Sequence, residues 1–305
     1  MRKRTMSILI IIATIILIIA IWFNIPYSPV KNEFVKDVKE CIEKSGSTPM
    51  CVITKADFEN FPPAIQKYIE NCGYIGTPHK SYLRMFYKNV DFMQGKNGPK
   101  LKIDYTQYDF GIITNPKNGG VKALSEASLD HTYNVAEPCR LALIDSSMFG
   151  IPFQGYDYYK NGIGGMKGVI AKCFTLFNQT GAEMDKACLA TYLAEIMFLP
   201  SALLSGFITF EEIDDYNVRA TISNGGQTCS GVFTFNQNYE YISFTTNDRA
   251  VSNPDNTMEN IPWSAICGDY KVSASGIKYP STFKAVWNYP ESDFVYFDGK
   301  LSEVN

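Results

Sequence analysis

The sequence predicts an α+β protein in which a curved antiparallel sheet, shaped like half of a barrel, is covered by one amphipathic helix. Three observations lead to this fold class. An apolar run at the N-terminus has the length of a membrane span. From about Tyr82 onward, short alternating segments are separated by Gly, Asn and Pro, as in strands joined by tight turns. One helical pattern, residues 182–199, interrupts these segments and carries an apolar stripe.

The N-terminal segment MRKRTMSILIIIATIILIIAIWFNIPYS predicts a membrane anchor. Three basic residues, Arg2 to Arg4, precede the apolar run, and no further charge occurs until Lys31. Positive charge before a span keeps that end in the cytoplasm. We therefore predict a cytoplasmic tail (1–5), a transmembrane anchor (6–25) and an extracytoplasmic main domain on the cell membrane. A cleaved signal peptide is the alternative, although no A-x-A-like cleavage site follows the run.

A small helical linker section is predicted between the anchor and the sheet, over residues 26–80. Its first helix covers residues 32–45, where apolar side chains recur at spacings of three and four. The second begins at Pro62 and Pro63, which suit a first helical turn, and ends before Gly73, which suits a C-terminal cap.

Residues 81–305 are predicted to form the β-rich extracytoplasmic domain. The strand segments are LKIDYTQYDFGIIT, CRLALID, GYDYYKNG and MKGVIAKCFTLFN before the helix, and NVRATIS, TCSGVFTFN, YEYISFTTN, DYKVSAS, TFKAVWN and FVYFDG after it. NGG and QN between three of the later strands are hairpin signals. Sequential strands with short connections make an antiparallel meander. Pro200 is expected to stop the helix.

Composition excludes several classes of function. Without the three N-terminal cations, 25 basic residues face 31 acidic ones, and no basic cluster remains for a nucleic-acid partner. The two histidines have no catalytic or zinc motif around them, and none of the eight cysteines forms a C-x-x-C pair. We therefore predict no cofactor and no metal, and we assign no catalytic residue. Cys41 with Cys51 is the local pair to test for a disulfide in an exported chain.

The acidic stretch FITFEEIDDYNVRATI, Phe207 to Ile222, raises the question of a metal or acid–base site. Strand alternation points Glu211 and Glu212 to opposite faces. Asp214 and Asp215 fall where a hairpin turn is expected, and aspartate is favoured there because its side chain bonds nearby backbone amides. The pattern favours a turn. A cation or catalytic site and a buried ion pair are the alternatives.

Glu195 lies at the margin of the apolar stripe on the long helix. A carboxylate in that position needs a partner if it is buried. Arg249, at the end of the strand segment SFTTNDR, is the partner we expect. A solvated Glu195 at the edge of the helix is the alternative.

Seven motifs occur in a familiar order: FPPAIQKYI, GYDYYKNGIGGMKG, LATYLAEIMFLPSALL, FEEIDDYNVRATI, NDRA, IPWSA and GIKYPSTFKAVW. Over residues 61–305 the chain resembles an exported or membrane-anchored bacterial family of unknown function, for which the resemblance implies no activity. It departs from the family at Phe210, where tryptophan is usual. The family's characteristic positions correspond to Asp157, Gly162, Gly164, Tyr192, Glu195, Pro200, Asp214, Arg249, Pro262, Trp263, Gly276, Pro280 and Trp287. More distantly, the chain is similar to curved-sheet carriers of lipoproteins and lipids.

These inferences predict a membrane-anchored protein that binds a hydrophobic or lipid-like ligand in the cavity of a curved sheet. The residues expected to bind the ligand are Tyr192, Glu195, Arg249 and Trp263. Asp157, Asp214 and Trp287 are expected to have structural or ion-pair roles. Two alternatives stay open: a hydrolase-like enzyme that uses Glu195, Asp214 and Arg249, and a cell-surface scaffold with an exposed apolar patch.

Overall fold

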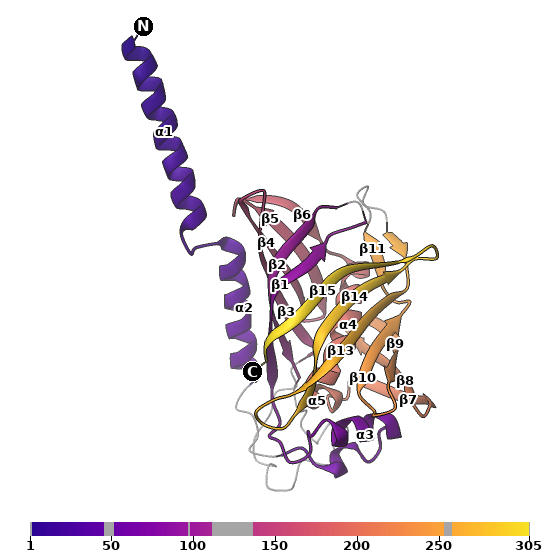
Figure 1. The fold of residues 1–305 in the computed structure, drawn as a ribbon. Coiled ribbons are helices and arrows are strands. Elements are labelled where there is room, and N and C mark those ends of the chain that lie inside the picture. The colour runs from indigo at the N-terminus through magenta and orange to yellow at the C-terminus, as the bar shows by residue number, and fades with distance from the viewer. Residues whose placement is uncertain (1, 46–51, 97, 112–136, 253–257, 305) are drawn as a thin grey trace.

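The computed structural model describes residues 2–45, 52–96, 98–111, 137–252 and 258–304, and Figure 1 shows its fold. The helical elements are α1 (Arg2–Asn24), α2 (Pro29–Ser45), η1 (Lys55–Phe58), α3 (Pro63–Asn71), α4 (Ala182–Glu195), η4 (Ile196–Phe198) and α5 (Pro200–Leu203). The first six strands are β1 (Tyr82–Met93), β2 (Lys100–Phe110), β3 (Cys139–Met148), β4 (Ile151–Lys160), β5 (Ile163–Ile170) and β6 (Phe174–Gln179). The remaining strands are β7 (Ile208–Asp214), β8 (Asn217–Asn224), β9 (Gln227–Phe235), β10 (Tyr241–Thr246), β11 (Ala250–Ser252), β12 (Met258–Asn260), β13 (Trp263–Val272), β14 (Lys278–Asn288) and β15 (Asp293–Val304).

Thirteen of these strands form one curved antiparallel sheet, which confirms the predicted fold class. Their order is β6-β5-β4-β3-β2-β1-β15-β14-β13-β10-β9-β8-β7. The chain first runs outward from β1 to the edge strand β6. It then crosses to the opposite edge, β7, and returns strand by strand to β15, which pairs with β1. The first and last strands therefore meet in the middle of the sheet, and β11 and β12 form a separate two-stranded ribbon.

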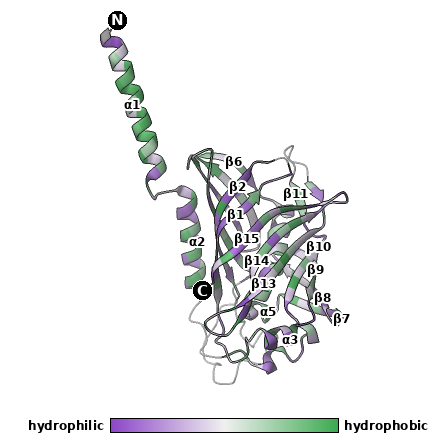
Figure 2. Ribbon diagram, in the orientation of Figure 1, coloured by the Kyte–Doolittle hydropathy of each residue, from purple (hydrophilic) through white to green (hydrophobic). Residues whose placement is uncertain are grey.

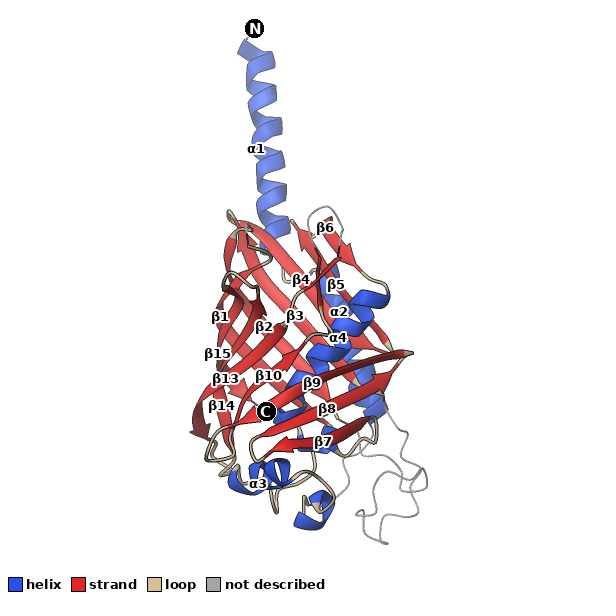
Figure 3. Cartoon of the chain, turned by 90° about the vertical axis from the view of Figure 1, so that its right-hand side faces the viewer, coloured by secondary structure: helices blue, strands red, loops and turns tan. Residues whose placement is uncertain are grey.

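Helix α4 makes the crossing between the two edges on the inner side of the curve (Figure 3). The helix packs on the sheet as predicted, but its solvent-exposed residues are confined to its first part, because nine consecutive residues, 187–195, are all buried. A helix that is buried on every side has no polar face. The sheet curves round it, and its side chains belong to the main hydrophobic core. Pro200 ends the helical run as predicted, after one 3₁₀ turn, and begins the short helix α5.

Helix α2 covers the outer face of the sheet instead of lying apart from it. Its buried face, Val30, Phe34, Val38 and Cys41, packs against side chains of β2 to β5. Charged contacts flank this apolar seam, since Lys160 bonds Asp37 at 2.9 Å and Glu40 at 3.1 Å. The predicted helix at 32–45 is confirmed with an earlier start. The division of the sequence into 1–5, 6–25, 26–80 and 81–305 stays a prediction.

Helix α3 closes the end of the curved sheet that lies opposite α1 (Figure 1). It begins at Pro63 and is followed by Gly73 at φ +79°, as the capping pattern predicts. Its buried side chains join the main core, and the Tyr68 hydroxyl donates to the Met197 carbonyl at 2.7 Å. The helix is therefore packed on the same core as α4.

The predicted strand MKGVIAKCFTLFN is in fact two strands, β5 and β6, joined by a turn at residues 171–173. Ala171 and Lys172 both have positive φ, 54° and 64°. Turns of this kind usually carry Gly or Asn. The sequence IAKC contains neither residue, so the turn has no local signal. It is held by tertiary contacts with α1, which are described below.

Among the described cysteines, one close pair was not predicted from the sequence. The sulfur atoms of Cys41 on α2 and Cys139 on β3 lie 3.3 Å apart in a buried contact. Their separation along the chain is 98 residues. Cys51, the partner expected for Cys41, lies outside the described residues.

Close approach of α4 to β5 depends on a glycine. A Cβ atom added at Gly164 would lie 2.7 Å from the Cβ of Cys188 and 2.7 Å from the Met184 carbonyl oxygen. The Gly164 amide also donates to Asp185 on α4 at 2.8 Å. Any side chain at this position would push the helix away from the sheet.

We expect Gly164→Ala to lower the free energy of unfolding by about 1–3 kcal/mol, the usual cost of overpacking a core. Urea denaturation of the full chain in detergent measures it. Gly95→Ala is the matched control, because a Cβ there meets no atom within 4 Å. Equal stability of the two variants would contradict the close packing of α4.

Candidate functional site

The inner face of strands β2 to β4 carries a polar cluster within an otherwise apolar core. Side chains alternate along a strand, and the inward positions of β2 are Leu101, Ile103, Tyr105, Gln107 and Asp109. Arg140 is the inward residue of β3 that lies opposite Asp109 in the strand register. Asp157 comes from β4 and Glu195 from the last turn of α4. Three strands and the crossing helix therefore meet at one point.

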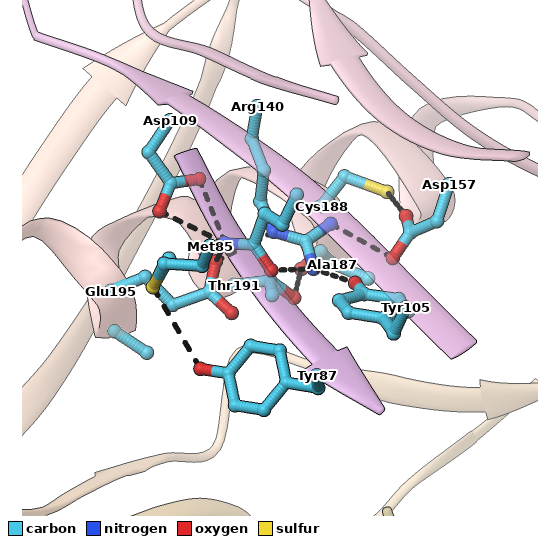
Figure 4. Close-up of polar contacts among 12 residues, drawn as sticks. Met85, Tyr87, Tyr105, Asp109, Arg140, Asp157, Ala187, Cys188, Thr191 and Glu195 are labelled. Atoms are coloured by element: carbon cyan, nitrogen blue, oxygen red, sulfur yellow. Dashed lines mark hydrogen bonds and ion pairs between the residues drawn. The ribbon is translucent and has the colours of Figure 1, made fainter. Parts of the chain in front are cut away.

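Arg140 is the centre of the cluster, and its guanidinium is fully engaged (Figure 4). Its Nε donates to Glu195 at 2.6 Å, and its Nη1 donates to Asp157 at 2.8 Å. Its Nη2 donates to the Tyr105 hydroxyl at 2.6 Å. The side chains of Arg140 and Glu195 are only 3% and 5% exposed, so this ion pair lies in a region of low dielectric, where charges need such partners.

Gln107 links Asp109 to Glu195, and so to the residues around Arg140. Its amide nitrogen donates to both oxygens of Asp109, at 2.8 and 2.9 Å, and to Glu195 at 2.7 Å. Asp109 has no direct bond to Arg140 among the described contacts. Burial, followed by the nearby charge of Glu195, raises the pKa of Asp109 well above its ordinary value. Burial also raises the pKa of Glu195, although the Arg140 charge opposes that shift.

A cavity of about 170 Å³ lies beside this cluster. Its inner wall includes Arg140, Asp157 and Glu195, and its outer part reaches the exposed residues Gln94 and Met258. The rest of the wall is largely apolar and includes Phe92, Ile144, Met166, Met184, Phe283 and Phe297. The surface of this wall is nearly as polar as it is apolar, so the cavity is more polar than the usual small-molecule site, which is mainly apolar with a few polar groups.

Arg249 also lines the cavity, in surroundings unlike those of Arg140. Its guanidinium carbon lies 4.3 Å from the ring centre of Trp263 and 5.2 Å from that of Trp287, which are opposite each other on β13 and β14. Its Nη1 donates to the Tyr296 hydroxyl at 3.2 Å. Within the described part of the chain it has no carboxylate partner, and its buried Nε has no acceptor.

A second cavity, of about 330 Å³, lies toward the end that α3 closes. Its wall is mainly apolar and includes Leu83, Met85, Phe198, Leu199, Ile277 and Leu301. Tyr87 belongs to the walls of both cavities. Its ring packs edge-on against Phe297, with ring centres 5.7 Å apart, and its hydroxyl contacts the Met85 sulfur at 3.7 Å. One aromatic side chain therefore stands between the two spaces.

The residues predicted to bind a ligand do not all reach the cavity. Glu195, Arg249 and Trp263 line it, as do Asp157 and Trp287, which had been assigned structural or ion-pair roles. Tyr192 does not line it, because its hydroxyl donates to the Phe110 carbonyl at 2.9 Å in the buried core. The expected pair of Glu195 with Arg249 is wrong, since Glu195 is bonded to Arg140.

The acidic stretch at 207–222 is a hairpin, as the turn interpretation predicted. Asp214 accepts from the backbone amides of Tyr216 and Asn217, each at 2.9 Å, and these bonds lower its pKa. Glu211 pairs with Arg219 at 3.5 Å on the exposed surface. Asp214 is exposed and is absent from the cavity wall, so Glu195, Asp214 and Arg249 do not form one site. The hydrolase-like alternative built on these three residues is therefore wrong.

Arg140, Gln107 and Asp109 are the site residues that sequence reasoning missed. A signal for them was present, because Gln107, Asp109 and Arg140 interrupt inward positions that are otherwise apolar in LKIDYTQYDF and CRLALID. Finding Arg140 also required the register of β2 with β3 and the place where α4 ends. Among the described residues, no group of three or more His, Cys, Asp or Glu side chains is arranged to hold a metal ion.

In a comparison with known families, residues 51–118 and 114–299 of the chain match the model of DUF6544, a family of unknown function. The chain belongs to this family. The resemblance noted in the sequence is thereby confirmed for most of the chain. No curated protein matches the chain.

Two solved structures are similar to the chain at very low sequence identity. One is described as a candidate outer membrane lipoprotein-sorting protein domain from Vibrio parahaemolyticus, with 7% identity, a TM-score of 0.38, and coverage of 74% of this chain and 85% of that one. The other is a DUF1329 family protein from Desulfovibrio piger, with 9% identity, a TM-score of 0.39, and coverage of 79% and 91%. The fold assignment rests on the strand pairing of the chain itself, not on these likenesses.

The raised pKa of Asp109 gives a prediction about pH. The folded chain keeps a proton on this carboxyl at pH values where the unfolded chain releases it, so stability falls as pH rises from about 4 through the raised pKa. We expect the Asp109→Asn variant to lose less stability than the native chain as pH rises. It should be at least as stable as the native chain near neutral pH. Urea denaturation across the range measures the slope.

Asp214→Asn is the control, because Asp214 changes the pH dependence of stability in the opposite direction. The lowered pKa of Asp214 stabilises the native chain above about pH 4, and this stabilisation is lost as pH falls through the lowered pKa. The control variant should therefore differ from the native chain at neutral pH and converge with it in acid. A slope left unchanged or made steeper by Asp109→Asn would contradict the raised pKa of Asp109.

Proposed function

We propose that this DUF6544 protein is a membrane-anchored, extracytoplasmic binding protein whose ligand combines an apolar body with an anionic group. The cavity inside the curved sheet would hold the apolar body, and Arg249 would bind the anion. The observation that carries the proposal is the contrast between the two cavity arginines. Arg140 is bonded to two carboxylates and to the Tyr105 hydroxyl, whereas Arg249 faces the cavity with no acidic partner among the described residues.

The setting of Arg249 suits a carboxylate or a phosphate. An arginine presents its donors in a planar fork that matches such groups. The guanidinium lies over the rings of Trp263 and Trp287, and the Tyr296 hydroxyl accepts from both Arg249 and Trp263, at 3.2 and 3.0 Å. The donors are therefore held in place before a ligand arrives, which lowers the entropy cost of binding.

The size of the two cavities favours an elongated ligand. A volume of about 170 Å³ is below the usual range for a drug-sized ligand, about 300–1,000 Å³, and the second cavity of about 330 Å³ reaches that range. Rotation of the Tyr87 side chain would join them. An apolar chain could then extend from the Arg249 end toward Leu83 and Leu301.

The anchor is helix α1, whose apolar side chains run along its whole middle section (Figure 2). The helix is long and apolar enough to cross a membrane, a test that a signal sequence also passes. We infer an anchor that is retained, because Trp22 and Ile25 at its end bond to the body of the protein. The basic residues before the span would place the N-terminus in the cytoplasm.

We expect Arg249→Gln to lose the ligand. The full chain is purified in detergent, and its organic extract is analysed by mass spectrometry for an anionic amphiphile. Loss of a charge-assisted hydrogen bond costs about 1.5–3 kcal/mol, which is a fall in affinity of about tenfold or more. Tryptophan emission gives a second readout, since Trp263 and Trp287 flank the site.

Arg219→Gln is the matched control, because Arg219 is an arginine on the exposed hairpin β7–β8 and is remote from the cavity wall. It should retain the ligand at the native level. The absence of any amphiphile from the native protein, or equal amounts in the Arg249→Gln and native extracts, would contradict the proposal.

A further inference from the structure

The end of the sheet nearest α1 carries apolar side chains that nothing in the described chain covers. Consecutive antiparallel strands place the turns β1–β2, β3–β4, β5–β6 and β14–β15 at the same end, and β11–β12 lies there too. We call this end the anchor-side rim. On it, Phe149 is 94% exposed, Phe174 66% and Leu176 51%. Phe149 is more exposed than any other large apolar side chain that the structure describes, including those of α1.

Phe149 occupies a position that is unfavourable for phenylalanine. It and Gly150 form the β3–β4 turn with φ values of +53° and +79°. At the opposite end of the sheet, Asn161 and Gly162 form the β4–β5 turn with nearly the same values, +54° and +76°. Asn-Gly is the preferred pair for this turn, and an aromatic residue with positive φ is uncommon. With its ring exposed, Phe149 gains little packing within the chain to offset this strain.

The body is fixed to α1 at the same rim. The Trp22 indole donates to the Ala171 carbonyl at 2.8 Å. The Lys172 ammonium donates to the carbonyls of Trp22 and Ile25, at 2.8 and 2.7 Å, and so satisfies the last turn of the helix. Lys172 is 5% exposed although it is a lysine. The β5–β6 turn is therefore held at the level where α1 ends.

Helix α2 makes this attachment rigid. It leaves the end of α1 and runs along the outer face of β2 to β5, held by an apolar seam, by bonds from Ser28 to Gln154, and by ion pairs from Lys31 to Asp145 and from Lys167 to Glu33. Trp22 and Tyr27 flank the junction with their rings 6.3 Å apart. Tryptophan and tyrosine are enriched at membrane interfaces. If α1 crosses a bilayer, the anchor-side rim lies at the surface of that bilayer.

We propose that Phe149, Phe174 and Leu176 rest in the interfacial layer of the bilayer that α1 crosses, and that the cavity mouth at Gln94 and Met258 therefore faces the lipid. The occupant of the apolar rim is the membrane itself, because the rim continues from the end of the chain's own anchor. The proposal rests on the anchor assigned under the proposed function. It adds a route for the ligand, which would pass between the membrane and the cavity without crossing water.

The test uses the full chain in phosphatidylcholine vesicles, with a tryptophan placed at either of the two equivalent turns. Phe149→Trp probes the anchor-side rim, and Asn161→Trp is the matched control at the far end. Lipids brominated near the headgroup quench tryptophans that enter the interface. We expect the fluorescence added at position 149 to be shifted to the blue and quenched, and that added at 161 to be neither. Quenching at 149 no greater than at 161 would overturn the proposal.

Two further measurements separate the possible failures. The quenching that Trp22→Phe removes from the native chain reports insertion of α1, because Trp263 and Trp287 also emit, and its absence would overturn both the anchor and the rim contact. Quenching at position 149 should be unchanged when Arg249→Gln is added, so failure of the ligand proposal leaves this result intact. Phe149→Asn restores the preferred turn pair and should leave the Tm equal or higher. A lower Tm would show that Phe149 supports the fold, which would overturn a role in membrane contact.

Discussion

The contact between Glu195 and Arg140 is the constraint on which the rest of the structure depends. Glu195 ends α4, whose last nine residues are all buried, at the end where the helix dipole is negative and the surroundings are apolar. A carboxylate in that position needs a cation. Arg140 supplies it from the middle of β3, so the end of α4 is joined to the sheet at one defined point. That junction sets where the chain can leave for the second half of the sheet.

The same ion pair also determines which polar groups on the inner face of the sheet are engaged and where the cavity lies. Arg140 uses its donors on Glu195, Asp157 and Tyr105, and it serves as an internal brace. Because α4 fills one part of the curve, the space that remains lies between the cluster and the strands β13 to β15. Arg249 enters that space from the β10–β11 connection, with its guanidinium over the rings of Trp263 and Trp287. The two arginines therefore differ: Arg140 holds the end of α4, whereas Arg249 has no carboxylate partner among the described residues and is the group proposed to bind a ligand.

Local sequence patterns predicted much of the fold but only some of the site residues. Alternating strands, Asn and Gly turns, and the caps of α3 predicted the meander, because these signals act over a few residues. The β5–β6 turn was missed, since Ala171 and Lys172 hold positive φ through contacts with α1 that are remote in sequence. Glu195 was singled out for its burial, yet its partner could not be chosen without the register of β2 with β3. The enclosure of α4 likewise depends on how strongly the sheet curves.

A double-mutant cycle on Arg140 and Glu195 tests the central claim most directly. Removing one partner of a buried pair costs about 3–5 kcal/mol, because the other charge is left buried and unpaired. Arg140→Met and Glu195→Leu should each be strongly destabilising in urea unfolding, and the double variant should lose clearly less than their sum. We predict a coupling free energy of about 2 kcal/mol or more, within the range seen for residues in one network. Losses that add to within about 0.5 kcal/mol would contradict the account.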